Sequence, residues 1–486
     1  MSGAISGRGR WLALTVLCLG VLMIVLDTTV VNVALPSIRD DLGFSETSLV
    51  WVVNAYLLTF GGFLLLGGRL GDLYGHRTLF LWGITGFTLA SLACGLATSQ
   101  EQLIVARAVQ GIGGAVVNAV ALSLLMSLFT AEAERAKAMG VFGFVCAGGG
   151  SVGMLLGGFL TSSINWHWVF FVNIPIGIIV FALCLVLLPR GAEQTASKHL
   201  DIGGAVTVTA ALMLAVYAIV NGNEAGWLSV TTLGFLGASL GFFVAFLVIQ
   251  TRVRVPLVSL GLFRQRNLAT ANVICVLWAA GMFAWFFISA LYLQRVLAYS
   301  SLDVGLAFLP ANVIMAIFSV GLSARLVMRF GHKRPATIGL LSAALGLALF
   351  SRMPVDGHFL PDVLPGMILI GTGAGMAFNP LLLVAMGDVE PSQSGLASGV
   401  VNTAFMMGGA LGLAILASGA AGRTEELVAA GTPALVALNS GYHVAFATGA
   451  ASAALGALFA GVLLRSQSAA AGTVTAAQTH SAAGSF

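Results

Sequence analysis

Apolar runs of about 20 residues recur along the whole sequence and are separated by short polar segments. As an α-helix, a run of this length crosses the hydrocarbon core of a bilayer, which is about 30 Å thick. The composition agrees, because 58% of the 486 residues are hydrophobic and only 8% are charged. A soluble globule of this size needs far more charged surface. The chain is therefore predicted to be an all-α integral membrane protein.

The expected membrane spans can be read directly from these runs. They are 11–34, 48–67, 78–98, 102–126, 137–161, 168–188, 201–221, 230–250, 268–293, 303–328, 335–352, 361–386, 395–420 and 442–464. The length criterion thus predicts about fourteen transmembrane helices. No cleavable signal peptide is expected, because the first run is long and continues directly into Leu35, Pro36 and a charged segment.

Basic residues are concentrated on one side of this topology. That side holds Arg8, Arg10, Arg69, Arg77, Arg135, Lys137, Arg190, Lys198, Arg252, Arg254, Arg264, Arg266, Arg325, Arg329, Lys333, Arg334 and Arg465. The other side holds Arg39, Arg295, Arg352 and Arg423. The positive-inside rule therefore predicts a multi-pass protein of the cell membrane with both termini in the cytoplasm. A nucleic-acid-binding surface is disfavoured, because the charges are scattered among short loops.

Two side-chain types that commonly bind metals show no ligand pattern. The five cysteines lie inside apolar runs without CxxC spacing, and the seven histidines form no ligand-spaced cluster. The sequence also lacks a GxxxxGK[ST] phosphate loop and a His/Cys/acid constellation for catalysis. We therefore expect no metal, no cofactor and no enzymatic activity.

One motif occurs twice. It reads RLGDLYGHR at 69–77 and RLVMRFGHK at 325–333, so that Arg, Leu, aromatic, Gly, His and basic positions match. The repeat predicts two equivalent six-helix bundles, with the spans 201–221 and 230–250 left over between them. Two such halves, with a path at their interface, are the arrangement that permits alternating access in transporters.

The repeat also predicts how the chain is divided. The expected parts are a cytoplasmic N-terminus at 1–10, an N-terminal six-helix bundle at 11–190, a two-helix insertion at 191–260, a C-terminal six-helix bundle at 261–465 and a cytoplasmic tail at 466–486. The tail is rich in Ala, Gly, Ser and Thr, which is typical of a flexible segment.

Two charged side chains lie well inside the spans, away from their ends. Asp27 lies near the middle of the first span and Arg107 within the fourth. A charge at this depth costs roughly 2.5–3.5 kcal/mol on insertion scales, so it more often marks a pathway than a scaffold. Burial favours the neutral acid and a nearby cation favours the carboxylate, a sensitivity that would let Asp27 couple a substrate to a proton. Glu224 is the second candidate acid. The alternatives are that Asp27 is simply hydrogen-bonded to Thr28, Asn32 or a neighbouring helix, and that Arg107 is a tether between helices.

Several motifs resemble those of one transporter family. The segment GRLGDLYGHR at 68–77 resembles the loop after the second helix of the major facilitator superfamily, and LDTTVVNVALP at 26–36 is similar to the first-helix motif of its fourteen-span drug:proton antiporters. The segment 103–114 resembles the fourth-helix motif, whose arginine is linked to proton transfer in that family. WHWVFFVNIPIG at 166–177 resembles the approach to helix six. The resemblance implies the major facilitator fold, with two six-helix bundles and two additional central helices, and proton-coupled drug export.

The two copies of the loop motif are expected to form a conformational gate. Glycines allow a tight turn, and Asp72 can pair with Arg77 or face the positive end of a helix. The alternative is that these charges only set the topology. The expected gate residues are Gly68, Arg69, Asp72, Gly75, Arg77, Arg325, Arg329 and Gly331. Met328 replaces the acid in the second copy, so the two copies are not expected to be equivalent.

Other polar and aromatic side chains within the spans are candidates for a substrate cavity, with helix packing as the alternative for most of them. These candidates are Asn32, Asn54, Tyr56, Gln110, Asn118, Trp285, Asn312, Asn379 and Phe405. A set of small residues, Gly153, Gly157 and Gly158, resembles the fifth-helix packing motif of antiporters, although Met154 stands where that motif has proline. Small residues permit close helix approach.

The function expected from these features is export of hydrophobic or amphipathic drugs in exchange for protons by alternating access. The expected partners are a drug-like small molecule, protons and the lipid bilayer, with no nucleic acid, and the chain is expected to act as a monomer. A proton-coupled symporter or a uniporter of a small metabolite with the same fold is the alternative. A membrane enzyme or a sensor is disfavoured, because the sequence lacks the groups or the soluble domain that it needs.

Overall fold

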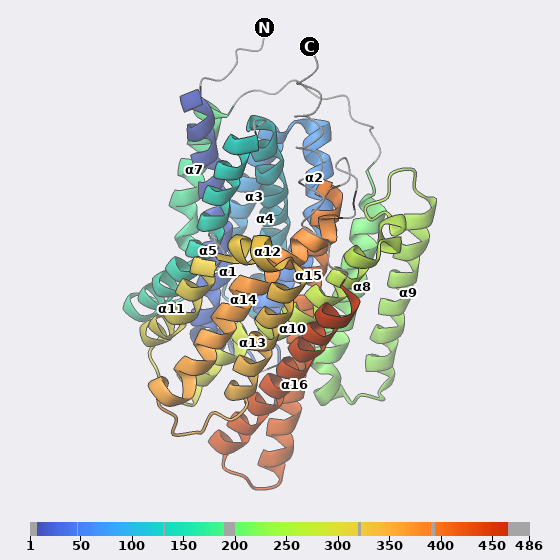
Figure 1. The fold of residues 1–486 in the computed structure, drawn as a ribbon. Coiled ribbons are helices and arrows are strands. Elements are labelled where there is room, and N and C mark those ends of the chain that lie inside the picture. The colour runs from blue at the N-terminus through green and yellow to red at the C-terminus, as the bar shows by residue number, and fades with distance from the viewer. Residues whose placement is uncertain are drawn as a thin grey trace, which may run out of the picture.

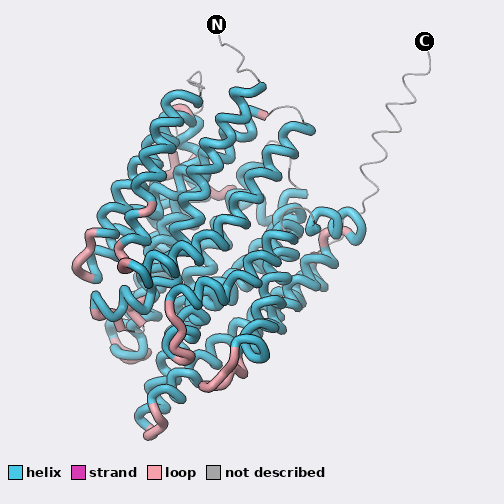
Figure 2. The backbone as a smooth tube through the Cα atoms, turned by 90° about the vertical axis from the view of Figure 1, so that its left-hand side faces the viewer, coloured by secondary structure: helices cyan, strands magenta, loops and turns pink. Residues whose placement is uncertain are grey.

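The computed structural model describes residues 7–45, 47–129, 132–188, 200–318, 322–387, 389 and 394–464. Regular structure in these residues is helical throughout, and no strand occurs among them (Figure 1, Figure 2). Eleven helices of this part of the chain are long and apolar enough to cross a membrane, and Ser301–Ile317 is a shorter apolar helix. The all-helical class predicted from the sequence is therefore confirmed.

The helices follow one another with short connections. The first group is α1 (Gly7–Leu42), α2 (Val50–Tyr74), α3 (His76–Gly95), α4 (Gln100–Leu128), α5 (Glu132–Ser163), α6 (Trp168–Phe171) and α7 (Asn173–Leu187). The next two are α8 (Ile202–Ala225) and α9 (Val230–Arg252). The last group is the 3-10 helix η1 (Leu260–Arg264), α10 (Arg266–Arg295), α11 (Ser301–Ile317), α12 (Ser323–Phe330), α13 (Lys333–Phe350), the π-helical turn η3 (Phe359–Val363), α14 (Leu364–Gly387), α15 (Ser394–Ala429) and α16 (Ala434–Leu463).

Each span expected from the sequence overlaps a helix. The range 303–328 covers both α11 and α12, and residues 319–321 between them lie outside the described part of the chain. The 18-residue helix α13 begins with Lys333 and Arg334, which lowers the hydropathy of its first turn. Length and apolarity alone thus support fewer crossings than the fourteen expected. The tail at 466–486 and residues 1–6 of the N-terminus also lie outside the described residues.

Turns of the same kind separate the helices at the two copies of the loop motif. Gly75, between α2 and α3, has φ +85°, and Gly331, between α12 and α13, has φ +74°. Positive φ at these angles is easily adopted only by glycine. The repeated glycine seen in the sequence therefore has one conformational cause in both copies.

Helix packing repeats in the same way. The helices α3 and α4 cross so closely that a Cβ atom on Gly113 would lie 2.7 Å from the backbone nitrogen of Phe87. The helices α13 and α14 make an equivalent crossing, where a Cβ atom on Gly373 would lie 2.6 Å from the carbonyl oxygen of Gly339. Within a bilayer, helices associate through such close packing at small residues. The internal repeat thus extends from the sequence to the helix crossings.

The pair α8 and α9 lies on one flank of the molecule (Figure 1). The helix α8 packs against α2 and α15, one from each end of the chain, and α9 packs mainly against α8. Only 11% of the most apolar 18-residue stretch of α9 is buried inside the protein. An apolar helix with so little protein contact presents most of its surface to lipid.

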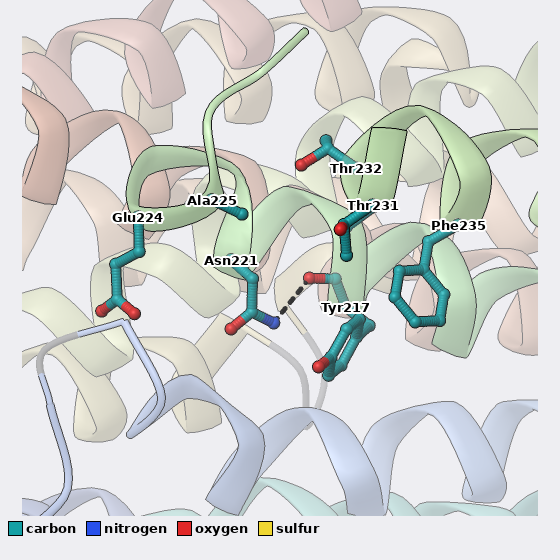
Figure 3. Close-up of a pocket in the computed structure, with 8 residues that line it drawn as sticks. Tyr217, Asn221, Glu224, Ala225, Thr231, Thr232 and Phe235 are labelled. Carbon is teal, nitrogen blue, oxygen red and sulfur yellow. Dashed lines mark hydrogen bonds between the residues drawn. The ribbon is translucent and has the colours of Figure 1, made fainter. Parts of the chain in front are cut away.

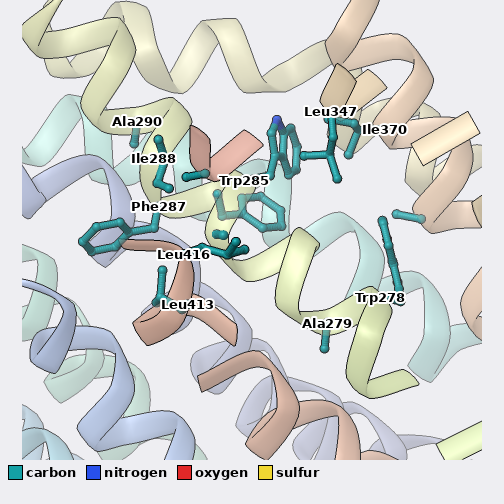
Figure 4. Packing of buried hydrophobic residues seen from close by; sticks show 14 of the residues in the cluster. Trp278, Ala279, Trp285, Phe287, Ile288, Ala290, Leu347, Ile370, Leu413 and Leu416 are labelled. Carbon is teal, nitrogen blue, oxygen red and sulfur yellow. The ribbon is translucent and has the colours of Figure 1, made fainter. Parts of the chain in front are cut away.

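Aromatic side chains fill the core of the C-terminal helices (Figure 4). The ring of Trp285 on α10 lies 5.2 Å from that of Phe308 on α11 and 6.4 Å from that of Phe350 on α13, measured between centroids. Trp278 lies two turns before Trp285 on the same face of α10 and is 1% exposed. These rings hold α10, α11 and α13 together by dispersion and by edge-to-face contact.

Candidate functional site

A buried hydrogen-bonded group ties three N-terminal helices together around Asp27. The Arg107 Nη1 atom donates to Asp27 Oδ2 at 2.6 Å, and Gln110 Nε2 and Asn173 Nδ2 donate to Asp27 Oδ1 at 2.7 and 2.9 Å. Gln110 Nε2 also donates to Ser91 Oγ at 2.7 Å. These side chains are at most 1% exposed. Helices α1, α4 and α7 are therefore joined at one carboxylate, with α3 behind it.

The Arg107 guanidinium has further partners besides the carboxylate. Its Nε atom donates to the Val52 carbonyl oxygen at 2.9 Å, and Nη1 also donates to Gln110 Oε1 at 2.6 Å. Its Cζ atom lies 4.4 Å from the centroid of the Tyr56 ring and 5.7 Å from that of the Phe170 ring. A cation near the face of an aromatic ring is attracted by the π-electrons. The guanidinium is thus held by a carboxylate, two oxygens and two rings.

The geometry around Asp27 fits an ionised carboxylate. The side chains that contact its oxygens are Arg107, Gln110 and Asn173, and each of them donates a hydrogen. An ionised carboxylate is a pure acceptor, whereas a protonated one needs an acceptor for its own hydrogen. Adding a proton would displace a donor and leave the Arg107 cation without its counter-ion, which is costly in a buried site. The hydrogen bonds that this carboxylate accepts therefore join α1 to α4 and α7.

Two polar neighbours of Asp27 on α1 bond elsewhere. Thr28 Oγ1 donates to the Val25 carbonyl oxygen at 2.9 Å, and Asn32 Nδ2 donates to the Thr28 carbonyl oxygen at 2.9 Å. Such bonds to the preceding turn are common for these side chains in helices. Thr28 and Asn32 therefore do not hold the carboxylate, and the part of the structural alternative that this geometry matches is the bonding of Asp27 to neighbouring helices.

Glu224 does not join this group. It lies one residue before the end of α8, is exposed, and lines a cavity between α8 and α9, whereas the side chains bonded to Asp27 come from α4 and α7. No group of three or more His, Cys, Asp or Glu side chains among the described residues lies close enough to hold a metal ion. Asp27 is thus the acid at the centre of the site.

The residues expected to form a gate make contacts within the N-terminal helices. Arg77 Nη2 donates to the Leu185 carbonyl oxygen at 2.7 Å, so its charge lies at the C-terminal end of α7, where the helix dipole is negative. Gly68 faces α4 and Arg69 is exposed. The side chain of Asp72, the expected partner of Arg77, lies outside the described residues. The contact with α7 is thus the one that the structure describes for Arg77.

In the second copy of the motif the charged side chains lie at the surface. Arg325 and Arg329 are exposed, and the Arg329 guanidinium lies 5.2 Å from the centroid of the Phe330 ring. Met328, which stands in the position of the acid, is 73% exposed. The two copies share the glycine turn but differ in their charged contacts.

The expected packing glycines on α5 lie against two different helices. Gly153 and Gly157 face α1, and a Cβ atom on Gly158 would lie 2.5 Å from the carbonyl oxygen of Ser301 on α11. The helix α5 runs continuously through Met154, which is fully buried. These glycines thus set the approach of α5 to α1 on one side and to α11 on the other.

The candidates for a substrate cavity are not gathered in one place. Tyr56 and Gln110 lie at Arg107, as described above. Asn54 Nδ2 donates to the Ala410 carbonyl oxygen at 3.0 Å and so links α2 to α15. Trp285 belongs to the aromatic core of the C-terminal helices. Asn312 is 1% exposed and its Nδ2 atom has no hydrogen-bond partner, while Asn118 and Asn379 are half-buried.

Phe405 belongs to a smaller aromatic cluster. Its ring on α15 lies 5.6 Å from that of Phe283 on α10 and 5.1 Å from that of Phe378 on α14. Phe283 also packs against a second buried cluster, which joins residues of the N-terminal helices to Ala410 and Ala414 on α15. The cluster therefore lies where helices from the two ends of the chain meet.

Sequence reasoning assigned no site role to Asn173, Ser91 or Phe170. Asn173 and Phe170 lie within the 166–177 motif, and the break between α6 and α7 places Asn173 at the start of α7, facing Asp27. The available signal was that Asn173 interrupts the apolar stretch 168–176 of that motif. Ser91 gives no such signal, because a serine within an apolar span is common.

Comparison with known proteins agrees with this architecture. The model of the Major Facilitator Superfamily matches residues 17–413. The puromycin resistance protein pur8 of Streptomyces alboniger is 40% identical over 95% of this chain and 93% of its own length. The cephamycin export protein CmcT of Amycolatopsis lactamdurans is 38% identical over 85% of this chain and 87% of its own length. The fold is also similar to that of an auto-inhibited POT family peptide transporter, with a TM-score of 0.64 at 16% identity over 94% of this chain and 96% of the other. The chain therefore belongs to the Major Facilitator Superfamily, and its similar relatives include proteins named for antibiotic resistance and export.

Proposed function

We propose that this protein exports hydrophobic or amphipathic drug-like molecules across the cell membrane in exchange for protons. The relatives named for puromycin resistance and cephamycin export support the export of such molecules. The observation that carries the proton exchange is the fully buried carboxylate of Asp27, bonded to Arg107, Gln110 and Asn173. A buried acid whose partners are all donors has a low-energy ionised state in this conformation and must change its contacts to accept a proton.

The proton acts by weakening the hydrogen bonds that join α1 to α4 and α7. With Asp27 ionised, α1 is held to α4 and α7. When a proton from outside neutralises Asp27, its bond to Arg107 weakens, and the guanidinium keeps the Val52 carbonyl and the rings of Tyr56 and Phe170. Helix α1 is then free to shift relative to α4. Alternating access of the two halves follows from this loosening. One charge moving across 100 mV supplies about 2.3 kcal/mol, to which any pH gradient adds.

The topology proposed for this mechanism has fourteen crossings. The chain is divided into an N-terminal bundle at 11–190, a two-helix insertion at 191–260 and a C-terminal bundle at 261–465, with both termini in the cytoplasm. The distribution of Arg and Lys supports this orientation. The equivalent glycine turns and glycine crossings of the two bundles support the division. We propose a monomer as the working unit.

The drug contacts the helices where the two bundles meet. The cluster of Phe283, Phe378 and Phe405 offers apolar surface there, and phenyl rings adapt to ligands of different shape through offset and edge-on contacts. This surface carries no fixed charge, so a drug that is neutral or singly charged fits it best. In this proposal Asp27 binds the proton and the aromatic cluster binds the drug.

The decisive experiment measures drug movement and its dependence on the proton gradient. Inverted membrane vesicles that contain the protein are prepared from a pump-deficient host and energised, and a fluorescent antibiotic or dye is added to the medium outside them. The expected result is uptake into the inverted vesicles that stops with a protonophore. Asp27→Asn should abolish this uptake, because an amide cannot exchange a proton, while the variant stays folded. Movement in the opposite direction would support the symporter alternative and contradict export.

The matched control is Glu101→Gln. This variant also exchanges an acid for its amide in the N-terminal helices, but Glu101 is exposed in the first turn of α4. Uptake by Glu101→Gln should equal that of the unchanged protein. Full gradient-driven uptake by Asp27→Asn would reject the proton role of Asp27.

A further inference from the structure

A second candidate binding site lies at the connected end of α8 and α9, apart from the Asp27 group. A cavity of about 300 Å³ opens there, and both helices line it. Its walls are Tyr217, Ala218, Asn221, Glu224 and Ala225 from α8 and Thr231, Thr232 and Phe235 from α9. Figure 3 shows the Glu224 carboxylate at one end and the rings of Tyr217 and Phe235 at the other, with Asn221 between them. The volume suits the head of a small ligand.

The chemistry of the lining selects for positive charge. Glu224 is the only charged side chain in it, and no ion pair to Glu224 occurs among the described residues. The rings of Tyr217 and Phe235 pack edge to face, with 4.7 Å between their centroids. Tyr217 is 42% exposed, so part of its ring is accessible to a ligand. A carboxylate and accessible aromatic surface together favour an organic cation over an anion or a neutral sugar.

The exposed apolar side chains beside the cavity indicate that it lies at the membrane interface, where amphipathic molecules accumulate. The turn between the two helices exposes apolar side chains, with Trp227 49%, Leu228 87% and Val230 91% exposed. Tryptophan is typical of the interface between a membrane and water, at the level of the lipid headgroups. A ligand that reaches this cavity from the boundary carries both a charged head and an apolar body.

The helix α8 holds the cavity in a fixed position relative to α15. Asn223 Nδ2 donates to the Ser418 carbonyl oxygen at 2.7 Å, and Ser418 Oγ donates to the Ile219 carbonyl oxygen at 2.9 Å. Trp227 Nε1 donates to Asn223 Oδ1 at 3.1 Å. These bonds anchor one face of α8, while the face with Glu224 and Asn221 lines the cavity. The lining residues are therefore free to bind a ligand without breaking the contact with α15.

We propose that this cavity binds an amphipathic organic cation, with its positively charged head at Glu224 and its apolar part against Tyr217 and Phe235. Two sources share this chemistry, an exported cationic drug and a lipid with an amine headgroup. The inference goes beyond the proposed exchange at Asp27, because no residue of the cavity belongs to the Asp27 group. The two extra helices would then have a ligand-binding role of their own.

The test uses the full-length protein in nanodiscs of phosphatidylglycerol and a photoreactive quaternary ammonium with an alkyl chain as the probe. The expected labelling is on peptides that contain Tyr217 or Phe235. Glu224→Gln should weaken probe binding about tenfold, because it removes the only charge in the lining. Asp27→Asn should leave this labelling unchanged, which separates the inference from the proposed function.

Glu425→Gln is the matched control, since Glu425 is an exposed acid near the end of α15 that lines a smaller cavity of about 80 Å³. Equal weakening by both glutamine variants would show a general surface-charge effect and would overturn the proposal. Unchanged labelling in Glu224→Gln would overturn it as well. In nanodiscs that contain phosphatidylethanolamine, loss of labelling identifies a resident lipid and retained labelling identifies a free cation, and both outcomes support a site for an amphipathic cation.

Discussion

Arg107 keeps a full set of partners only while Asp27 is ionised. Once Asp27 binds a proton, the guanidinium depends on the Val52 carbonyl oxygen, on Gln110 Oε1 and on the rings of Tyr56 and Phe170. The nearest ring is that of Tyr56, at 4.4 Å. The other titratable side chain beside this group is Cys94, whose Sγ atom lies 3.6 Å from Gln110 Oε1. We infer that the rings help to hold the guanidinium in place when the charge of Asp27 is neutralised.

Substitution of Tyr56 tests this inference. Tyr56→Leu removes the ring, and a buried cation–π contact is worth about 0.5–2 kcal/mol, so drug transport should fall by roughly 2–30-fold. Tyr56→Phe is the matched control, since it keeps the ring and removes a hydroxyl without a hydrogen-bond partner. Transport by Tyr56→Leu equal to that of Tyr56→Phe would contradict a role of the ring in holding Arg107.

The residues of the site differ in how well the sequence predicted them. Asp27 and Arg107 were found because a charge inside an apolar span is rare, and Gln110 because it lies one turn from Arg107 on the same helix face. Asn173 and Ser91 were not assigned, because their roles depend on which faces of α7 and α3 turn toward α1. Glu224 was chosen from its position at the edge of a span, and sequence position cannot show that α8 lies on the flank of the molecule.

Among the helices, α8 and α9 depend on a second buried acid. Asp201, which is 5% exposed, accepts from the backbone nitrogen of Gly204 at 2.7 Å, from Gln250 Nε2 at 2.6 Å and from the backbone nitrogen of Leu257 at 3.0 Å. Gln250 Oε1 in turn accepts from the backbone nitrogen of Val258 at 2.9 Å. One carboxylate thus caps α8 and fixes both the end of α9 and the segment that leads to the C-terminal helices.

Replacement of this acid should loosen the helix pair. Asp201→Ala leaves three donors without their acceptor, and each buried unsatisfied donor costs about 1–3 kcal/mol. The midpoint of thermal unfolding in detergent should fall, while transport per folded molecule is retained. Asp303→Ala is the control, because Asp303 also lies in the first turn of a helix but is exposed, so water can replace its bonds. Equal midpoints of thermal unfolding for Asp201→Ala and Asp303→Ala would contradict the role of Asp201 in holding α8 and α9 together.

At the scale of the whole molecule, the two halves have the same helix crossings but different buried chemistry. In the register that pairs Gly113 with Gly373, the position of Arg107 is taken by Met367, which is fully buried. The C-terminal core there is apolar and aromatic, without a counterpart of the Asp27–Arg107 pair among its described residues. The repeat could be predicted from the loop motif alone. The asymmetry could not, because it appears only when the helices of the two halves are superimposed in register.

The halves meet through glycines at the end of the molecule where α5 ends and α11 begins. A Cβ atom on Gly305 would lie 2.6 Å from the Met154 carbonyl oxygen, and one on Gly158 would lie 2.5 Å from that of Ser301. On the same side, Gln294 Nε2 donates to the Val33 carbonyl oxygen at 2.9 Å. By the proposed orientation this is the outer end, so these contacts would hold the two halves together on the outer side.

A large side chain at this contact should shift the balance between the conformations. Gly305→Leu forces α5 and α11 apart, and overpacking costs typically about 1–3 kcal/mol, which changes a two-state equilibrium by roughly 5–150-fold. Spin labels at the exposed positions Ser163 on α5 and Leu306 on α11, in a background without other cysteines, should report a longer distance by pulsed electron paramagnetic resonance. Gly86→Leu provides the control, because nothing lies within 4 Å of a Cβ atom placed there. The same label distance in all three proteins would mean that this contact does not hold the two halves together at the outer end.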